Sequence, residues 1–236
     1  MTTRSKKVVL YGNAQMATFA QAVLTHDSPY EVVAFTVDEA LIKETTILGL
    51  PVVPFETVER TYPPEDFAAH IAVGFRRVNG VRAEKYYQAK EKGYELLTYV
   101  SSQAFKWPDL VIGDNCWILE HTILHPFVTI GNNVYLGSEC HIGHNSTIGD
   151  HTFMAGLAGL AGGVNVGTHC FFGIHSTVRN GLSIADRCVI GAGATVLRST
   201  RERGVYVAHQ ATMLPTPSDG LAEDFREGAG MSMMEW

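Results

Sequence analysis

The sequence lacks a long apolar run, and none of its clusters of Lys and Arg exceeds a few residues. Its 236 residues carry 18 Lys and Arg against 24 Asp and Glu, which gives a formal net charge of -6. The first apolar run, residues 8–11, is far too short for a signal peptide or a membrane span. Scattered basic residues in a mildly acidic chain give no electrostatic reason to expect a nucleic-acid partner. We therefore expect a cytoplasmic protein that binds neither nucleic acid nor membrane.

Cysteine is scarce, and its spacing does not match the common metal and disulfide patterns. No two of the four cysteines have the Cys-x-x-Cys spacing; they are Cys116, Cys140, Cys170 and Cys188. Disulfides are also rare in a reducing compartment. Because a buried thiol behaves as a small apolar side chain, we expect all four cysteines in the core.

A six-residue repeat begins at Ile112 and continues for fifteen units without a miss. The residue after the apolar anchor is glycine in eight units and alanine in three. This position therefore accepts only a very small side chain or none. The residue four places after the anchor is small or β-branched in fourteen of the fifteen units, and all four cysteines belong to this class. The anchors are Ile112, Ile118, Leu124, Ile130, Leu136, Ile142, Ile148, Met154, Leu160, Val166, Phe172, Val178, Ile184, Ile190 and Val196.

A period of six fits neither a helix, whose apolar face recurs every 3.6 residues, nor a free strand, whose side chains alternate. It fits a triangular coil in which each unit supplies one short strand and one corner. Three units complete a turn, and successive turns stack through parallel hydrogen bonds. The turns would span residues 112–129, 130–147, 148–165, 166–183 and 184–201. We expect anchors and small residues in the interior and the glycines at tight corners.

The first hundred residues alternate between strands and helices. We expect strands at 7–11, 31–35, 69–74 and 95–100, and helices at 15–24 and 81–92. This alternation predicts a small Rossmann-like parallel α/β domain. Gly12 after the first strand and Asp38 after the second outline a nucleotide site, and a purely structural α/β cap explains them equally well. Arg82 could pair with phosphates or lie on a solvated helix face.

The motifs of both halves resemble known families. The hexad pattern resembles the hexapeptide repeat of the left-handed β-helix acyltransferases over residues 110–201, and the left hand of the coil is implied by this resemblance. Together with the α/β domain, residues 48–54 (LGLPVVP) and a Val-Gly-Phe strand end resemble the nucleotide-sugar acyltransferases. These include N-acetyltransferases of nucleotide-linked 4-amino sugars and the sialic-acid O-acetyltransferase-like group. The resemblance implies a nucleotide on the N-terminal domain, a homotrimer, and acyl-CoA in the groove between neighbouring coils.

Histidines cluster around the sixth unit of the repeat. Because Ile142 is an anchor, His144 lies just past a corner, where its side chain should point outward. The resemblance implies that His144 is the general base, a role that suits a side chain with a reference pKa of about 6.5. Asn145 stands where the family often places an acid that orients this histidine. Asp150 or Glu139 could supply the missing charge.

Gly162 lies one full turn, eighteen residues, after His144. The same register on adjacent turns brings its backbone N–H near the histidine, and the resemblance implies that this amide meets the acyl oxygen. A wider set of ligand contacts follows from the resemblance and from the N-terminal motifs. Acetyl-CoA or another acyl-CoA would contact Phe153, Gly162, Gly163, Ile174 and Ala192, and the sugar substrate would contact Gly12, Asp38 and Arg82.

The remaining histidines do not match a zinc site. Zinc-dependent carbonic anhydrases built on the same type of coil use three histidines, two of them five residues apart. Here neighbouring histidines lie three, four, six or seven residues apart. Since an open tetrahedral site needs three correctly placed ligands, we expect no metal.

The sequence therefore predicts an acyl-CoA-dependent acyltransferase that acylates the amine of a nucleotide-linked amino sugar by direct attack. Two alternatives stay open: a sugar O-acetyltransferase of the same fold, and a non-catalytic trimeric scaffold or binding protein. We expect a Rossmann-like domain at residues 1–103 and an all-β left-handed parallel β-helix at 104–203. A C-terminal strand and capping tail would occupy residues 204–236.

Overall fold

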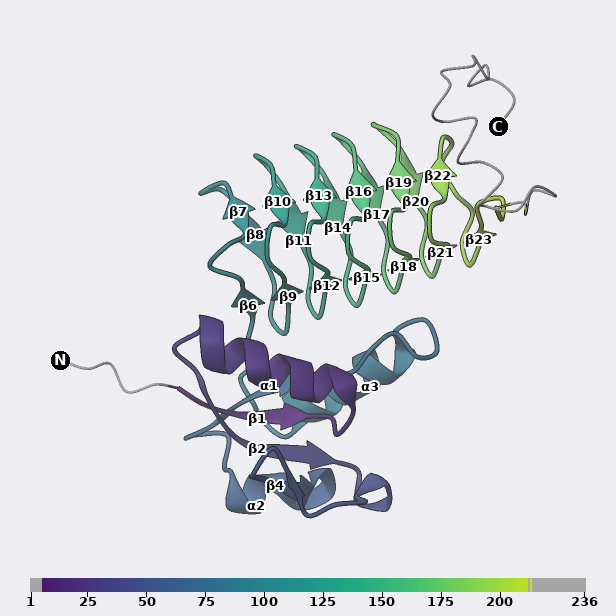
Figure 1. Ribbon diagram of the computed structural model, residues 1–236. Helices are drawn as coiled ribbons and strands as arrows, with labels where there is room; N and C mark the ends of the chain where they lie inside the picture. The colour runs from purple at the N-terminus through teal and green to yellow at the C-terminus, as the bar shows by residue number, and fades with distance from the viewer. Residues whose placement is uncertain (1–5, 212, 214–236) are drawn as a thin grey trace, which may run out of the picture.

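A computed structural model describes residues 6–211 and 213, which form a small α/β domain followed by a three-sided coil (Figure 1). The N-terminal sheet has the order β3-β4-β2-β1-β5, and only β3 runs antiparallel to its neighbour. Its strands are β1 (Lys7–Tyr11), β2 (Glu31–Val37), β3 (Thr46–Ile47), β4 (Leu50–Pro54) and β5 (Ala68–Ile71). The helices are α1 (Gln15–Asp27), α2 (Val58–Thr61) and α3 (Gly80–Glu91), with short 3-10 turns η1 (Glu39–Leu41) and η2 (Phe55–Thr57).

The predicted alternation is confirmed for the strands at 7–11, 31–35 and 69–74 and for both helices, and β1 has the predicted bounds. The predicted N-terminal strand at 95–100 is wrong, because Tyr99–Val100 pairs with the coil and Leu96 makes only an isolated bridge to Ala69. β1 lies between β2 and β5, so the strand order reverses beside it. In open parallel sheets, ligands bind outside the carboxyl ends of the strands at such a reversal. A ligand of this sheet is therefore expected at the turns that follow β1, β2 and β5.

The strands of the coil are two residues long and form three parallel sheets. Their paired residues are eighteen positions apart, except at the C-terminal end, where Val189 pairs with Val205. The first, called here the β13 sheet, contains β7 (Phe105–Lys106), β10 (Ile123–Leu124), β13 (His141–Ile142), β16 (Gly159–Leu160), β19 (Thr177–Val178) and β22 (Thr195–Val196). The β14 sheet contains β8 (Val111–Ile112), β11 (Thr129–Ile130), β14 (Thr147–Ile148), β17 (Asn165–Val166) and β20 (Ser183–Ile184). The docking sheet contains β6 (Tyr99–Val100), β9 (Trp117–Ile118), β12 (Tyr135–Leu136), β15 (Phe153–Met154), β18 (Phe171–Phe172), β21 (Val189–Ile190) and β23 (Val205–Tyr206).

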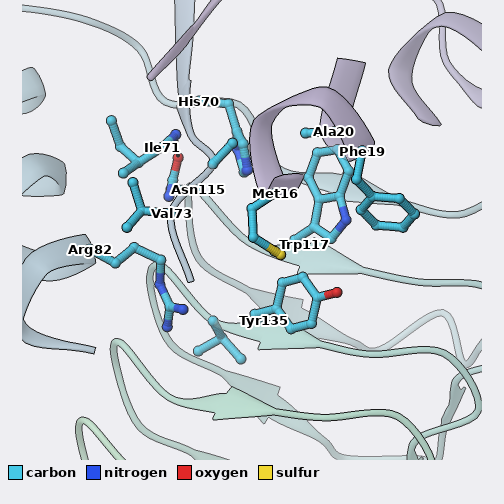
Figure 2. Close-up of a pocket in the computed structure, with 12 residues that line it drawn as sticks. Met16, Phe19, Ala20, His70, Ile71, Val73, Arg82, Asn115, Trp117 and Tyr135 are labelled. Atoms are coloured by element: carbon cyan, nitrogen blue, oxygen red, sulfur yellow. Dashed lines mark hydrogen bonds between the residues drawn. The ribbon is translucent and has the colours of Figure 1, made fainter. Parts of the chain in front are cut away.

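The N-terminal domain packs against the docking sheet. α1 lies between its own sheet and the first turns of the coil (Figure 1), and its buried face shares one hydrophobic cluster with Trp117 and Leu119. A cavity of about 10 Å³ remains in this junction, which is room for about one water molecule. Figure 2 shows its lining, in which Met16 and Phe19 come from α1, Arg82 from α3, and Trp117 and Tyr135 from the coil.

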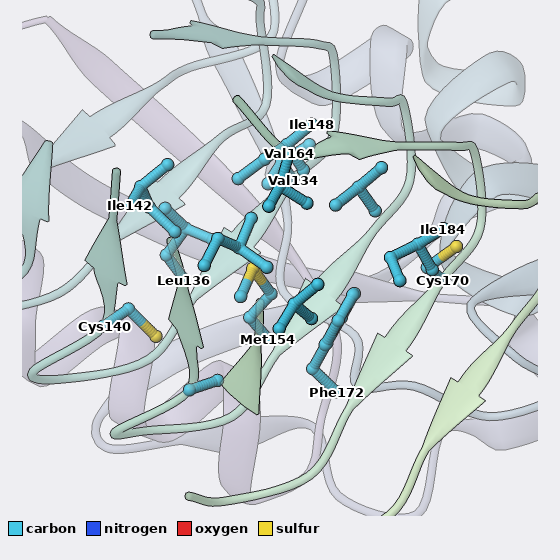
Figure 3. Close-up of a cluster of buried hydrophobic side chains, with 14 of the residues drawn as sticks. Val134, Leu136, Cys140, Ile142, Ile148, Met154, Val164, Cys170, Phe172 and Ile184 are labelled. Atoms are coloured by element: carbon cyan, nitrogen blue, oxygen red, sulfur yellow. The ribbon is translucent and has the colours of Figure 1, made fainter. Parts of the chain in front are cut away.

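The interior of the coil contains the predicted core (Figure 3). Fourteen of the fifteen anchors are buried, and Ile112, in the first turn, is half-buried. Thirteen of the fourteen small or β-branched residues of the second class are buried as well, and Thr200, in the last unit, is half-buried. The four cysteines are free and buried, and burial raises the pKa of Cys116, Cys140 and Cys170 to about 12. Because the thiolate is the reactive form, these cysteines act as core residues.

The glycines of the repeat directly follow strands, where each corner begins. The left-handed backbone occurs two residues after the glycine, at Asn133 (φ 56°), His151 (φ 62°) and their equivalents on other turns. The glycine is needed for the stacking of turns, since a Cβ on Gly143 would lie 2.5 Å from the backbone of Ala161 on the next turn. Asparagine and histidine tolerate the left-handed conformation better than most residues, which explains why corners of this coil carry them. The predicted capping tail lies outside the described residues.

Candidate active site

His144 lies outside the coil at the corner between β13 and β14. Its anchor Ile142 is fully buried, so the next turn of chain places the side chains of His144 and Asn145 in solvent. The imidazole Nδ1 lies 2.9 Å from Oδ1 of Asn145. As oriented, Nδ1–H donates to the amide oxygen, which leaves the lone pair of Nε2 free to accept a proton. The predicted outward orientation of His144 is therefore observed.

Gly162 lies directly against the imidazole on the next turn. A Cβ added to Gly162 would lie 2.6 Å from Nε2 and 2.7 Å from Cε1 of His144. The backbone of the two turns is tied by the Gly163 N–H, which donates to the His144 carbonyl oxygen over 2.7 Å. The neighbouring Gly162 N–H donates to no described residue. The structure thus brings together an exposed imidazole and a backbone N–H that has no described acceptor, while the Gly163 amide is already engaged.

Two further histidines lie near this corner on the β13 sheet. The rings of His125 and His141 are 4.8 Å apart between centroids. Partial burial, and secondarily the charge of His125, lower the pKa of His141. No group of three or more His, Cys, Asp or Glu within residues 6–211 has an arrangement that could hold a metal ion. None of the described helices has the length and apolar character needed to cross a bilayer.

Ile174 and Ala192 lie on a different corner from His144. Both follow strands of the docking sheet and precede strands of the β13 sheet, one turn apart, and both are exposed. Within one chain they therefore do not share a groove with His144, which lies between the β13 and β14 sheets. A groove that contains all three residues would have to combine corners of two coils.

The prediction that Phe153 lines an open groove is wrong for the chain described here. Phe153 is only 6% exposed and belongs to the docking sheet, where its ring stacks on Tyr135 with centroids 4.2 Å apart. Phe75, from the loop after β5, covers it with a centroid distance of 5.2 Å. The sequence showed an outward strand position, but it could not show that the N-terminal domain covers this sheet.

The prediction that Arg82 binds substrate is also wrong, because its side chain is buried in the domain junction (Figure 2). Nη2 of Arg82 donates to the carbonyl oxygens of Asn133, His151 and Thr152 at 2.9 to 3.2 Å. Burial lowers the pKa of the guanidinium to about 10, so it remains charged at neutral pH. Nε and Nη1 have no described partner, and Arg82 is one of the residues that line the cavity of the junction. Arg82 therefore joins α3 to the coil.

Gly12 and Asp38 lie together at the carboxyl edge of the N-terminal sheet. Gly12 adopts φ 141°, and a Cβ there would lie 2.8 Å from the carbonyl oxygen of Ala72. Close packing between the turns after β1 and β5 therefore already explains the glycine. Asp38 receives hydrogen bonds from the Tyr11 hydroxyl and from Lys85 Nζ. Binding of a nucleotide by these residues stays a prediction.

Sequence reasoning missed a ladder of polar side chains along the corner that precedes the docking sheet. Asn115 Nδ2 donates to Asn133 Oδ1 over 2.7 Å, and Asn133 Nδ2 lies 2.8 Å from His151 Nδ1. The Ile71 N–H donates to Asn115 Oδ1 at one end, and Tyr87 OH lies 3.0 Å from His151 Nε2 at the other. The recurrence of Asn, Asn and His every eighteen residues was a signal that could have revealed it.

Comparison with known proteins identifies the class to which this fold belongs. Residues 109–144 and 128–162 match the family of bacterial transferase hexapeptides (six repeats), and residues 163–198 match the hexapeptide repeat of succinyl-transferase. The chain has an α/β N-terminal domain followed by a left-handed parallel β-helix, as the sequence predicted. A search of curated proteins by sequence gave no match.

Solved structures share both halves of the fold. The acetyltransferase domain of PglB from Neisseria gonorrhoeae has a TM-score of 0.78 at 19% identity, with coverage of 89% of this chain and 100% of that one. PerB from Caulobacter crescentus, solved with CoA and GDP-perosamine, has a TM-score of 0.77 at 21% identity, with coverage of 86% and 94%. The PglB domain has also been solved with acetyl coenzyme A, with a TM-score of 0.78 at 17% identity and coverage of 89% and 100%. The predicted resemblance to the fold of nucleotide-sugar acetyltransferases is thereby confirmed.

Proposed function

We propose that this protein is an acyl-CoA-dependent acyltransferase that transfers an acetyl or similar group to the amine of a nucleotide-linked amino sugar. The observation that carries the proposal is the contact between the His144 imidazole and Gly162, with Nε2 free and Nδ1 bonded to Asn145. The complexes of PerB with CoA and GDP-perosamine and of the PglB domain with acetyl coenzyme A support the choice of substrates.

His144 acts as the general base in this proposal. The amine of the sugar attacks the thioester carbon, and Nε2 removes the proton that the amine loses as the new bond forms. Asn145 accepts the hydrogen bond from Nδ1–H and so keeps the lone pair on Nε2. A neutral amide orients the ring but gives the imidazolium less charge stabilisation than a carboxylate would.

Gly162 stabilises the oxygen of the thioester as it gains negative charge. Its N–H has no described acceptor, and Gly162 itself lies against the imidazole of His144. A preorganised backbone donor of this kind contributes about 3 kcal/mol to the transition state in acyl transfer. The thiolate of CoA then leaves as the tetrahedral intermediate collapses, and the proton held by His144 passes to it or to solvent.

A homotrimer would complete the site. The N-terminal domain covers the docking sheet, whereas His144 lies at the opposite corner of the coil. A nucleotide on that domain would therefore reach the His144 of a neighbouring coil more readily than its own. Apolar side chains on the two uncovered sheets support association between coils, including Phe105, Ile123 and Val111, which are 38 to 59% exposed.

The experiment compares His144→Gln with the parent protein in an assay of free thiol released from acetyl-CoA. Amino sugars and the matching hydroxy sugars linked to UDP, GDP and dTDP serve as acceptors. We expect a loss of at least about 100-fold in kcat for His144→Gln, with an unchanged oligomeric state and melting temperature. His121→Asn is the matched control, since His121 is an exposed corner histidine with φ 57° that asparagine can also adopt.

Three outcomes would reject parts of the proposal. Retention of most activity in His144→Gln would exclude His144 as the base. Turnover with hydroxy sugars alone would indicate a sugar O-acetyltransferase. A stable trimer that neither binds CoA in a calorimetric titration nor releases thiol would identify a non-catalytic scaffold.

A further inference from the structure

The corner that carries His144 continues along the coil as a ladder of backbone hydrogen bonds. The Asn145 N–H donates to the Pro126 carbonyl oxygen over 3.1 Å, and the Gly163 N–H donates to that of His144 over 2.7 Å. Successive turns stack as rungs (Figure 1), and hydrogen-bonded strands lie ~4.8 Å apart. Each position on this corner therefore has a known distance from His144 along the axis of the coil.

Phe127 occupies this corner one rung before Asn145. Its side chain is 66% exposed, and its backbone has φ 63°, a left-handed conformation that is unfavourable for a bulky residue. The Phe127 N–H donates to Asp109 Oδ2 over 2.6 Å, which helps to fix this backbone. The next two turns carry Gly163 and Gly181 after Asn145 at the same position. Backbone strain of this kind is concentrated at functional positions, so the exposed ring calls for a role on the surface.

The two ends of the coil differ in charge. Residues 107–178 contain five Asp and Glu but no Lys or Arg, whereas residues 179–203 contain five Arg and two acidic residues. Arg198 lies two residues after β22, as His144 lies two residues after β13, and both strands belong to the β13 sheet. Arg198 is therefore on the corner of His144, three rungs toward the C-terminus, and it is exposed. A polyanion is attracted to this end of the corner.

Three rungs match the length of the pantetheine arm of acyl-CoA. The arm has about twelve chain bonds between the sulfur and the first phosphate, as many as four amino-acid residues, and so spans ~14 Å when extended. Three rungs of the coil span ~14 Å as well. With the thioester at His144 and Gly162, the diphosphate reaches Arg198, whose guanidinium suits phosphate oxygens. The acyl group then extends in the opposite direction, toward Phe127.

We propose that Phe127 limits the length of the acyl group that this protein accepts. The inference rests on the proposed function, which places the thioester carbon at His144. One rung of ~4.8 Å separates the two residues along the axis, the length of about three C–C bonds of ~1.5 Å each. Acetyl, propionyl and butyryl groups fit within this length, whereas a hexanoyl group meets the ring. Phe127 thus determines specificity and takes no part in the proton transfer.

The test is calorimetric titration of the full chain with acetyl-CoA, butyryl-CoA and hexanoyl-CoA, without an acceptor sugar. We expect acetyl-CoA and butyryl-CoA to bind within about threefold of each other, and hexanoyl-CoA at least about tenfold more weakly because of the steric clash. Phe127→Gly removes the ring and adopts φ 63° without strain. In this variant hexanoyl-CoA should bind within about threefold of acetyl-CoA. Equal or tighter binding of hexanoyl-CoA by the parent protein overturns the inference.

Two further variants separate the effect of the ring from a general change of structure. Phe127→Asn also removes the ring and tolerates the left-handed backbone, so it should accept hexanoyl-CoA as Phe127→Gly does. His121→Gly is the matched control, because His121 is an exposed ring with φ 57° on another corner, and it should keep the preference of the parent. An unchanged preference in both Phe127 variants overturns the inference. Loss of the parent's oligomeric state in both would identify Phe127 as an interface residue and also overturns it.

The direction of CoA along the corner has its own test. Arg198→Gln should weaken the binding of acetyl-CoA at least about fivefold, since it removes a charged donor to phosphate. Arg187→Gln should leave the affinity unchanged, because Arg187 is an exposed arginine of the same end of the coil but on a different corner. An unchanged affinity in Arg198→Gln overturns this direction and, with it, the placement of the acyl group.

An assay of free thiol with an acceptor sugar keeps this result distinct from the proposed function. Equal turnover of acetyl-CoA and hexanoyl-CoA by the parent protein rejects only the role of Phe127. Acyl-CoA binding that depends on Phe127, without release of thiol, supports the role of Phe127 in binding and rejects the transferase. A chain that binds none of the acyl-CoA compounds rejects both.

Discussion

Two histidines of the coil, His144 and His151, lie seven residues apart in sequence and have opposite environments. His144 is exposed, with Nδ1 facing the amide oxygen of Asn145 and Nε2 free. His151 is 1% exposed beneath the N-terminal domain, with Nδ1 facing Asn133 and Nε2 facing Tyr87. The two rings therefore adopt opposite tautomers, because the neighbour of Nδ1 is an acceptor in one and a donor in the other.

The orientation of the amides beside His151 follows from one backbone group. Asn115 must turn Oδ1 toward the Ile71 N–H, so its Nδ2 points to Asn133. Asn133 must then turn its own Nδ2 toward His151, whose Nδ1 accepts and whose Nε2–H donates to Tyr87. The same residue type thus forms a structural link in one corner, whereas in the other it is exposed and its Nε2 has no described partner. The repeat places both histidines at corners, and the docked domain decides which one is available for chemistry.

The largest effect should come from crowding the free histidine. Gly162→Ala places a methyl group 2.6 Å from His144 Nε2, so the ring must move. We expect a loss of about 100-fold or more in kcat, with little change in the melting temperature. Gly159→Ala is the control, since its Cβ meets nothing closer than 4.0 Å. Full activity in Gly162→Ala would contradict the contact that defines the site.

The next largest effect should be a loss of stability when the buried ladder of Asn115, Asn133 and His151 is broken, a change that does not touch His144. Asn133→Leu leaves Asn115 Nδ2 and His151 Nδ1 without partners in the domain junction. Buried polar groups left unpaired cost about 1–3 kcal/mol each, so the free energy of unfolding should fall by about 3 kcal/mol in urea denaturation. Asn165→Ala, at an exposed position of β17, should change it by less than about 0.5 kcal/mol. Equal losses of unfolding free energy in both variants would show that the buried ladder contributes no more to stability than an exposed position does.

The buried corner should also give stability a dependence on pH. Burial lowers the pKa of His151 from 6.5 to about 4, and His169 adds to the effect. The unfolded chain then binds more protons than the folded one between these values, so stability is full above about pH 6.5 and declines toward pH 4. Denaturation of the parent and of His151→Asn at pH 7, 5.5 and 4.5 measures this, and the variant should show the weaker dependence. Nitrogen chemical shifts should also report a neutral His151 at pH 5.5, and a charged ring there would contradict the assignment.

The smallest effect should come from making the exposed corner more like that of the resembling family. Asn145→Asp places a carboxylate 2.9 Å from Nδ1 of His144 if it keeps the position of the amide oxygen. The negative charge favours the imidazolium, so the acid limb of the pH profile of kcat should move to higher pH by up to about one unit. The rate above that limb should rise a few-fold. Asn145→Ala should lower the rate instead, and identical profiles for the two variants would show that Asn145 does not orient the ring.

Much of the fold was predictable because the repeat is a local signal. The anchors from Ile118 to Val196 point inward as the period requires, and the register of eighteen places Gly162 against His144. The alternation in the N-terminal domain was predictable for the same reason, since each strand and helix carries its own pattern. The burial of Phe153 and Arg82 in the domain junction was not predictable. Each occupies an ordinary outward position in its own element, and its partners lie far away in sequence.

The sequence by itself determined the three-sided coil, its buried cysteines and the corner that exposes His144, because every six residues repeat the same choice between interior and surface. Only the tertiary structure decided which surfaces remain open. Phe75 covers Phe153 across 78 positions of sequence, and Arg82 reaches His151 across 69. Contacts between distant elements depend on the shapes of two folded surfaces, and no periodicity within either segment encodes them.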